Sequence, residues 1–246
     1  MPVAALKNLN LYYEIHGAED AAPLVLLHGA TETFRACWRR QIEPFSRRYR
    51  LIGLDLRGHG RSDNPAGKLD LRQMADDVRD LLDHLRLDKV HLLGYSGGGS
   101  TALFFGLRHP ERLRSLTLAS NNMELDRARG QVNFWNLARI RREEPRWWQA
   151  MTQMHGQPAE KLLQWWAEED SKRPNFQPGD LQHLHVPTLV VGGDRDPIIP
   201  LEQTLKLFRA LPDAYLCILP GVGHGAPRLR PQAFNQAVLD FLQFVA

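Results

Sequence analysis

The chain of 246 residues has an ordinary globular composition, with 43% hydrophobic and 24% charged residues, and is long enough to bury one sizeable core. Its 31 Lys and Arg residues nearly balance 28 Asp and Glu residues, which leaves a net charge of +3. The basic residues are spread along the sequence without forming blocks, which argues against nucleic acid or a membrane surface as a partner. The two cysteines, Cys37 and Cys217, lie far apart in the sequence, which argues against a disulfide framework and against a metal site.

The N-terminal residues do not have the basic segment followed by an apolar segment that is typical of a secretory signal. No apolar stretch approaches the roughly 18 residues that are needed to cross a membrane. We therefore expect a cytoplasmic protein that acts on a small molecule in solution.

Strand and helix signals alternate along the first part of the chain. Residues 9–17 alternate apolar and polar side chains and residues 23–29 form an apolar run, which predicts an exposed strand followed by a buried one. A further buried strand is predicted over 49–56. Apolar residues then recur at helical spacing over 71–87, and 89–96 returns to a strand pattern. This alternation is typical of a mostly parallel α/β sheet.

The alternation returns in the last part of the chain. The predicted elements there are strands over 113–120, 187–194 and 214–221 and helices over 200–211 and from about residue 231. Over residues 122–180 strand signals vanish, and helical segments begin at Pro145 and Pro158, a residue type favoured in the first helical turn. We predict an α/β core of residues 1–121 and 181–246, with residues 122–180 inserted as a helical cap.

One serine stands among glycines where a predicted strand gives way to a helix. The segment GYSGG, residues 94–98, matches the GxSxG pattern of a nucleophile elbow. Residues in this tight turn must be small two positions before and after the serine, because larger side chains would collide. We interpret Ser96 as a nucleophile. A glycine-rich turn without catalysis is the alternative interpretation.

A serine hydroxyl attacks well only when a base takes its proton and a third group orients that base. Among the ten histidines only His224 follows the last predicted strand, in the glycine-flanked segment PGVGHGAP. A surface loop histidine without a function is the alternative. The segment LVVGGDRDPIIP ends a buried strand with two carboxylates, Asp194 and Asp196. Either could orient the base, and an acidic residue at this point could also cap a helix.

These motifs resemble those of the α/β-hydrolase fold family, and the resemblance covers nearly the whole chain outside the predicted cap. In that family the acid follows a strand in a GxxDxxxP pattern, which Gly193, Asp196 and Pro200 match. The resemblance therefore favours Asp196 as the acid. Ser96 and His224 complete the family order of serine, acid and histidine. The fold implied is an eight-stranded, mostly parallel sheet flanked by helices.

Two further segments carry the resemblance. The segment LLHGAT is similar to the oxyanion loop of the family, which implies that the backbone amides of Ala30 and Gly97 hold the developing oxyanion. The segment LDLRGHGRSD, residues 54–63, resembles the DxRGxGxS loop of the family. We interpret that loop as scaffold, with a substrate contact through Arg57 or His59 as the alternative.

Other branches of the family fit less well. The dehalogenase and epoxide hydrolase branches resemble each other in placing an aspartate where this chain has Ser96, which argues against both activities. Some branches place the acid after the strand that ends near Ser120, but Asn121 and Asn122 stand there in this chain. We interpret His28 of the oxyanion loop as a packed, hydrogen-bonded residue without a catalytic role.

Five of the six tryptophans lie in the predicted cap. Packing of the cap on the core would explain any one of them. Together, so much aromatic surface above the serine favours a pocket for an apolar acyl or aryl group. The residues expected to line this pocket are Tyr95, Trp135, Trp147 and Trp165.

From these observations we expect a serine hydrolase that cleaves carboxylic esters of small to medium, largely apolar substrates with water. Ser96, His224 and Asp196 would form its catalytic triad, and no metal or organic cofactor is expected. A hydrolase that cleaves a C–C bond in ring-fission diketones stays open, as do a lactonase, a thioesterase and an amidase. A receptor that keeps the fold and binds a ligand without turnover is the alternative from another class.

Overall fold

The computed structural model describes residues 2–125, 134–156 and 158–245, and a single eight-stranded sheet lies at its centre. The strand order is β1-β2-β4-β3-β5-β6-β7-β8. The first two strands run antiparallel to their neighbours and the other six are parallel, so the predicted fold class is confirmed. The strands are β1 (Val3–Leu6), β2 (Leu9–His16), β3 (Pro23–Leu27), β4 (Arg50–Leu54), β5 (Val90–Tyr95), β6 (Leu113–Ala119), β7 (Thr188–Gly193) and β8 (Ala214–Leu219).

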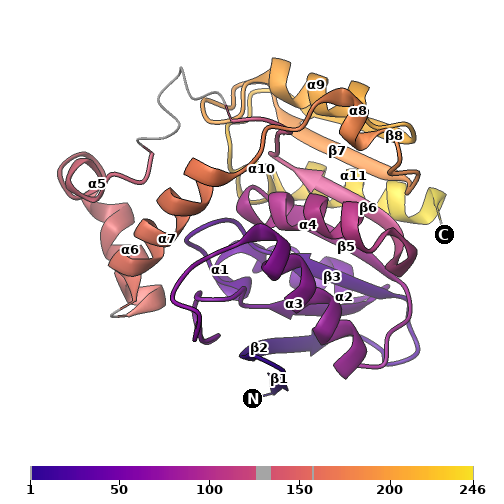
Figure 1. Ribbon diagram of the computed structural model, residues 1–246. Coiled ribbons are helices and arrows are strands. Elements are labelled where there is room, and N and C mark those ends of the chain that lie inside the picture. Colours follow the sequence, from indigo (N-terminus) through magenta and orange to yellow (C-terminus); the bar gives the residue numbers. More distant parts are fainter. Residues whose placement is uncertain (1, 126–133, 157, 246) are drawn as a thin grey trace.

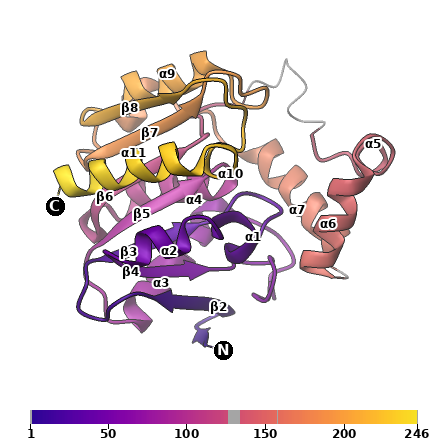
Figure 2. The same ribbon diagram turned by 180° about the vertical axis from the view of Figure 1, so that it is seen from behind.

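Helices cover both faces of the sheet (Figures 1 and 2). The face toward the viewer in Figure 1 is covered by α3 (Leu71–His84), α4 (Gly97–Arg108), α8 (Pro178–Leu181) and α9 (Leu201–Ala210). The opposite face is covered by α1 (Phe34–Trp38), α2 (Ile42–Ser46), α10 (Ala226–Leu229) and α11 (Pro231–Phe244). One large apolar cluster fills each interface. Because helices cover both faces of the sheet, a ligand-binding site is expected among the loops at the carboxyl ends of the parallel strands.

Local sequence explains where these elements begin and end. The side chain of Asp70 accepts hydrogen bonds from the backbone N–H groups of Arg72 and Gln73, and this N-cap starts α3 where the apolar spacing predicts it. The helix ends at His84, before Arg86, which has a φ of 55°. All six residues of strand β5 are buried, as expected of a central parallel strand.

Three helices of the insertion lie together beside the sheet (Figure 1). These inserted helices are α5 (Leu137–Glu143), α6 (Pro145–His155) and α7 (Ala159–Lys172). Pro145 begins α6 and Pro158 precedes α7, as predicted. The inserted helices have a small apolar cluster of their own, formed by Ile140, Met151, Ala159 and Leu163. The predicted end of the insertion at residue 180 falls inside α8, which packs against α9.

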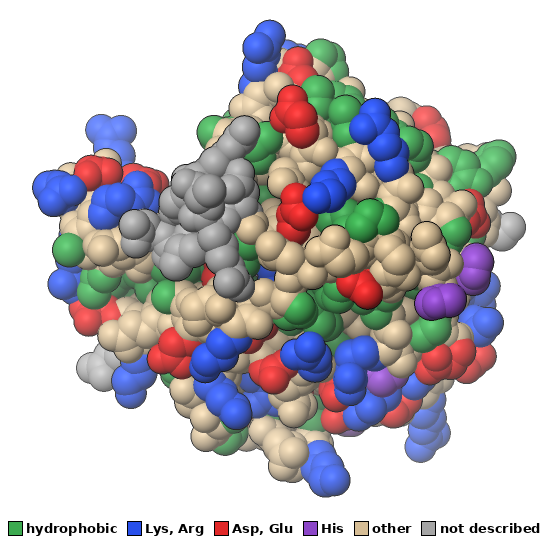
Figure 3. Space-filling model, turned by 45° about the horizontal axis from the view of Figure 1, so that its top comes forward, with side chains coloured by type: hydrophobic (Ala, Val, Ile, Leu, Met, Phe, Trp, Pro, Cys, Tyr) green, Lys and Arg blue, Asp and Glu red, His purple; other side chains and the backbone are tan. Residues whose placement is uncertain are grey.

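Positive and negative side chains are intermixed on the face of the molecule shown in Figure 3. This distribution agrees with the balanced composition of the chain. Among the residues that the structure describes, no helix combines the length and the apolar character needed to cross a bilayer. Cys37 is a buried free thiol in α1, and Cys217 is a partly buried free thiol in β8.

Candidate active site

The backbone at Ser96 forms a strained turn between β5 and α4. Its φ of 52° and ψ of −117° lie outside the regions that side chains normally allow. A Cβ atom added to Gly94 would lie 2.3 Å from the carbonyl oxygen of Gly98, and one added to Gly98 would lie 2.3 Å from that of His28. Glycine is therefore required on both sides of the serine, and the turn lifts the Ser96 side chain above the end of the sheet.

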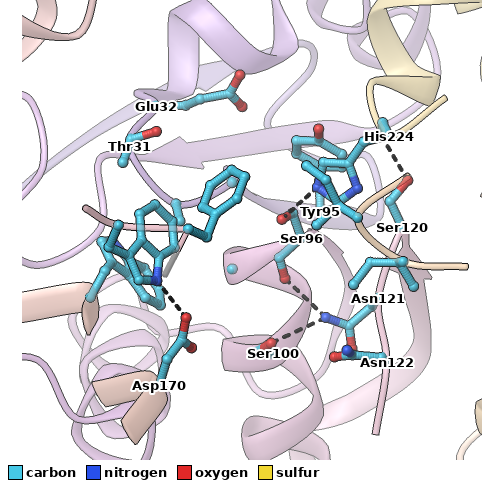
Figure 4. Close-up of a pocket in the computed structure, with 18 of the residues that line it drawn as sticks. Thr31, Glu32, Tyr95, Ser96, Ser100, Ser120, Asn121, Asn122, Asp170 and His224 are labelled. Atoms are coloured by element: carbon cyan, nitrogen blue, oxygen red, sulfur yellow. Dashed lines mark hydrogen bonds between the residues drawn. The ribbon is translucent and has the colours of Figure 1, made fainter. Parts of the chain in front are cut away.

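Three side chains from distant parts of the chain, Ser96, His224 and Asp196, form a continuous hydrogen-bonded row, of which Figure 4 shows the contact between Ser96 and His224. The Oγ atom of Ser96 lies 2.9 Å from Nε2 of His224, and Nδ1 of His224 lies 2.9 Å from Oδ2 of Asp196. The other carboxylate oxygen of Asp196 accepts hydrogen bonds from the backbone N–H groups of Ile198 and Ile199. The Asp196 carboxylate is thus fixed on one side by the backbone and faces the imidazole with the other.

The second carboxylate of the same loop has a different surrounding. Oδ1 of Asp194 accepts hydrogen bonds from the backbone N–H groups of Gly221 and Val222, at 2.6 and 3.2 Å. Asp194 therefore shapes the loop that carries His224 and lies away from the imidazole. The Ser120 hydroxyl also holds that loop, because it donates a hydrogen bond to the carbonyl oxygen of His224 (Figure 4).

Two backbone amides predicted to hold an oxyanion lie next to each other beside Ser96. Gly97 begins α4, so its N–H has no carbonyl partner within the helix. A Cβ atom on Gly97 would lie 2.8 Å from the backbone nitrogen of Ala30. The carbonyl oxygen of Gly29 accepts from Nδ1 of His28 and from the N–H of Glu32. In a trans peptide the N–H points opposite to the C=O, so the N–H of Ala30 points away from these two donors.

A pocket of about 450 Å³ opens beside Ser96. Of the four predicted lining residues, Tyr95, Trp135 and Trp147 line it. The prediction for Trp165 is wrong, because neighbouring side chains of a helix point about 100° apart. Trp166 lines the pocket instead, whereas Trp165 lies against Gly58 on the loop after β4.

One end of the pocket is polar, and sequence reasoning did not identify it. Ser100, Asn121, Asn122 and Arg173 are buried there. The guanidinium of Arg173 donates to Oγ of Ser100 and to Oδ1 of Asn122. Oδ1 of Asn121 and Nδ2 of Asn122 are buried and have no hydrogen-bond partner among the residues that the structure describes. Buried polar atoms without partners cost about 1–3 kcal/mol each, so this end is suited to a ligand with polar groups.

The charge at this polar end is nearly balanced. Burial lowers the pKa of Arg173, and the opposing carboxylates of Asp170 and Glu169 act to raise it. Burial raises the pKa of Asp170, whose carboxylate accepts a hydrogen bond from Nε1 of Trp135. No sequence motif connects the residues of the polar end. They lie in α4, after β6 and at the end of α7, and they meet only in the folded chain.

Glu32 and Arg228 form an ion pair elsewhere in the pocket lining. The guanidinium carbon of Arg228 lies 5.6 Å from the ring centroid of Tyr95. Burial lowers the pKa of Arg228. These residues also carry no recognisable sequence signal.

The loop over residues 54–63 has the contacts of a scaffold, as interpreted from the sequence. Arg57 makes two hydrogen bonds to Asp77 of α3, at 2.8 and 2.6 Å, and both side chains are buried. Neither Arg57 nor His59 is among the described residues that line the pocket. His28 is packed and hydrogen-bonded as interpreted, and burial lowers its pKa to about 4. In the described ranges, no three His, Cys, Asp or Glu side chains are grouped so that they could hold a metal ion.

The sequence profile of the alpha/beta hydrolase fold matches residues 22–152. The chain belongs to the α/β-hydrolase fold family. A second profile, that of the TAP-like protein family, matches residues 159–244. The family match extends from β3 through the elbow into α6, so it includes the strand, turn and helix that position Ser96.

Relatives in this family align with almost the whole chain. A putative carbamate hydrolase, RutD, of Caulobacter sp. strain K31 is 29% identical, over 94% of this chain and 95% of that protein. The 3-oxoadipate enol-lactonase 2 of Acinetobacter baylyi is 27% identical, over 94% of this chain and 92% of that protein. The structure of a thermophilic esterase from Thermogutta terrifontis superposes with a TM-score of 0.84 and 26% identity, over 100% and 99% of the two chains. These similarities class the chain as a hydrolase of the family.

Proposed function

We propose that this protein is a serine hydrolase that cleaves carboxylic esters with small to medium acyl groups. The observation that carries the proposal is the row of Ser96, His224 and Asp196, with both hydrogen bonds at 2.9 Å. A nucleophile, a base and an orienting acid in hydrogen-bond contact are what acyl transfer by a serine requires. A protein that only binds its ligand has no physical need for all three, which argues against the receptor alternative.

In the first half of the proposed reaction, Oγ of Ser96 attacks the ester carbonyl carbon while Nε2 of His224 takes its proton. The carbonyl oxygen becomes an anion, which the N–H groups of Ala30 and Gly97 stabilise. The C–O bond to the alcohol then breaks. The alcohol leaves with the proton from His224, and the acyl group stays on Ser96.

In the second half, water replaces the alcohol. His224 takes a proton from the water as its oxygen attacks the acyl carbon, and it returns this proton to Oγ of Ser96 when the acid departs. The carboxylate of Asp196 keeps the proton of His224 on Nδ1 and stabilises the imidazolium, so Nε2 faces Ser96 throughout.

The pocket supports a substrate that is largely apolar near the serine. Phe134, Trp135, Trp147, Trp166 and Ile199 contribute apolar surface to a volume suited to a small or medium ligand. The similarity to the thermophilic esterase agrees with this proposal.

A second candidate is hydrolysis of a lactone or of a ring-fission diketone whose acyl part carries a carbonyl or a carboxylate. The buried polar end of the pocket favours this candidate, since Arg173 and Nδ2 of Asn122 could donate hydrogen bonds to such a group. The similarity to an enol-lactonase points in the same direction.

The test is the initial rate of hydrolysis of p-nitrophenyl esters from acetate upward, with wild type and Ser96→Ala side by side. We expect a maximum at a short or medium acyl chain and a loss of at least about 10³-fold in kcat for Ser96→Ala. The Ser46→Ala variant of α2, at a partly exposed residue that does not line the pocket, controls for the loss of a hydroxyl and should match wild type. Turnover surviving in Ser96→Ala would overturn the proposal.

The same preparations distinguish the second candidate. Loss of a coloured dienolate, or opening of an enol-lactone, at a rate well above that of any simple ester would favour it. A ligand that binds wild type and Ser96→Ala equally, with no turnover of esters, lactone or dienolate, would favour the receptor alternative.

A further inference from the structure

Three buried histidines make edge-to-face ring contacts between the oxyanion loop, the loop after β4 and the inserted helices. The ring centroids of His28 and His59 lie 5.0 Å apart, and those of His59 and His155 lie 5.8 Å apart. His28 belongs to the oxyanion loop, whereas His155 is the last residue of α6. The mechanism above uses none of them directly.

The hydrogen bonds of His155 fix its protonation state. Nδ1 lies 2.9 Å from the backbone nitrogen of Gly60, and Nε2 lies 2.9 Å from the carbonyl oxygen of Thr31. A backbone N–H can only donate and a carbonyl can only accept, so Nδ1 accepts and Nε2 carries the proton. Burial lowers the pKa of His155, which favours this neutral form.

The carbonyl that His155 holds belongs to a strained residue. Thr31 has a φ of 65°, in the left-handed region that a β-branched side chain disfavours. Strain of this kind persists only where surrounding contacts enforce it. Thr31 directly follows Ala30, whose backbone nitrogen lies close to Gly97 beside the serine.

We propose that His155 is a positioning residue for the oxyanion loop, which it holds from the inserted helices through its Nε2–H bond to the Thr31 carbonyl. When that bond is lost, Thr31 relaxes toward negative φ and displaces the amide of Ala30. The oxyanion then loses part of its stabilisation, although the pocket keeps its lining. This inference rests on the proposed function of Ser96 and adds a role for α6 in the same reaction.

A neighbouring contact also ties the inserted helices to the core. Nε1 of Trp166 in α7 donates to Nε2 of His59, at 3.0 Å. His59 in turn donates from Nδ1 to the carbonyl oxygen of Arg57. That second tie reaches the loop after β4 and not the oxyanion loop, so only the His155 bond acts directly on Thr31.

Two substitutions separate the two hydrogen bonds of His155. In His155→Gln the side-chain amide can reach the position of Nε2 and donate to Thr31, whereas in His155→Asn it reaches only the position of Nδ1. We expect His155→Asn to lower kcat on the best p-nitrophenyl ester by about 10-fold, with KM changed less than about 2-fold, since removing a whole oxyanion donor costs about 10²–10³-fold. His155→Gln should stay within about 3-fold of wild type.

A trifluoromethyl ketone gives a second readout, because its adduct with Ser96 places an oxyanion beside Ala30. Its inhibition constant should rise in His155→Asn by the same factor by which kcat/KM falls. Met151→Ala is the matched control, since Met151 is a buried residue of the same helix in the apolar cluster of the inserted helices. It should lower the melting temperature and leave kcat within about 2-fold.

The outcomes separate the two proposals. An unchanged kcat in His155→Asn, an effect on KM alone, or an equal loss of kcat in Met151→Ala would overturn the role of His155. If Ser96→Ala is inactive in the same assay, the proposed function stands in each of those cases. Activity that survives in Ser96→Ala would overturn the proposed function, and the role of His155 with it.

Discussion

Asp196 accepts a hydrogen bond from Nδ1 of His224, 28 residues further along the chain, with 2.9 Å between the two atoms. Its neighbour Asp194, two residues earlier, accepts hydrogen bonds from the backbone of the 221–222 turn and lies 3.8 Å from Nε of Arg195. The two carboxylates follow the same strand, β7, but the loop directs the Asp196 side chain toward His224 and the Asp194 side chain toward the 221–222 turn. One is placed to act on the imidazole, and the other shapes the loop that carries it.

The first prediction separates the two carboxylates. Asp196→Asn should lower kcat on the order of 10⁴-fold, because an amide can donate to Nδ1 and thereby favour the wrong tautomer of His224. Asp194→Asn should lower kcat less than about 10-fold, because it weakens only two bonds to the backbone. Both rates are measured on the same ester as the Ser96→Ala control. A similar loss in both variants would contradict the assignment of Asp196.

The second prediction concerns the space between the two oxyanion amides. In Gly97→Ala the new Cβ would lie 2.8 Å from the nitrogen of Ala30 and 3.0 Å from the ring of Trp166. The oxyanion loop must then move, and kcat should fall by about 10- to 100-fold. Gly106→Ala is the matched control on the same helix, because its Cβ meets only flexible side-chain atoms, at 3.3 Å and beyond. Equal kcat values for the two variants would argue against this oxyanion site.

The third prediction tests the scaffold role of the loop over 54–63. Arg57→Met leaves Asp77 as a buried unpaired carboxylate and should lower the free energy of unfolding by about 3–5 kcal/mol. Arg47→Met breaks a pair with Glu43 whose side chains are 73% and 76% exposed, and should cost less than about 1 kcal/mol. Urea denaturation measures both.

A double variant completes this test. Arg57→Met combined with Asp77→Leu should recover most of the loss, because it removes the unpaired charge as well. A loss below about 1 kcal/mol in Arg57→Met alone would show that the buried pair does not stabilise the fold.

The fourth prediction concerns pH. Burial, assisted by the charge of Arg114, lowers the pKa of His91 to about 4. As the pH falls below 6.5, the unfolded chain binds a proton at this residue that the folded chain does not yet bind. The contribution of neutral His91 to the free energy of unfolding is therefore fully present above pH 6.5 and is lost progressively between pH 6.5 and about 4.

His91→Asn removes this titration and can keep a hydrogen bond to the Ser115 hydroxyl. The decrease in the free energy of unfolding between pH 7 and 4 should be smaller than in wild type by about 3 kcal/mol, since one pKa unit corresponds to about 1.4 kcal/mol. The exposed His183→Asn variant should follow the wild-type curve. An identical pH dependence in His91→Asn would contradict the prediction.

The sequence by itself determined the strand and helix order and the positions of the catalytic candidates. The strand β5 is apolar except for His91, because both faces of a central parallel strand are covered, so its burial could be predicted from its residues. The elbow at Ser96 is equally local, because only glycine fits at Gly94 and Gly98. His224 could be named from its place after the last strand. The place after β7 left Asp194 and Asp196 as alternatives, and the GxxDxxxP pattern of the family favoured Asp196.

Only the tertiary structure decided what surrounds these groups. The choice of Trp166 over Trp165 depends on the rotation of α7 about its axis, and both residues have the same character in the sequence. The polar end around Arg173 and the hydrogen bond from His155 to Thr31 join segments that are 51 to 124 residues apart. Local patterns specify which face of an element is buried, whereas the partners that meet across that face are fixed only by how the elements pack.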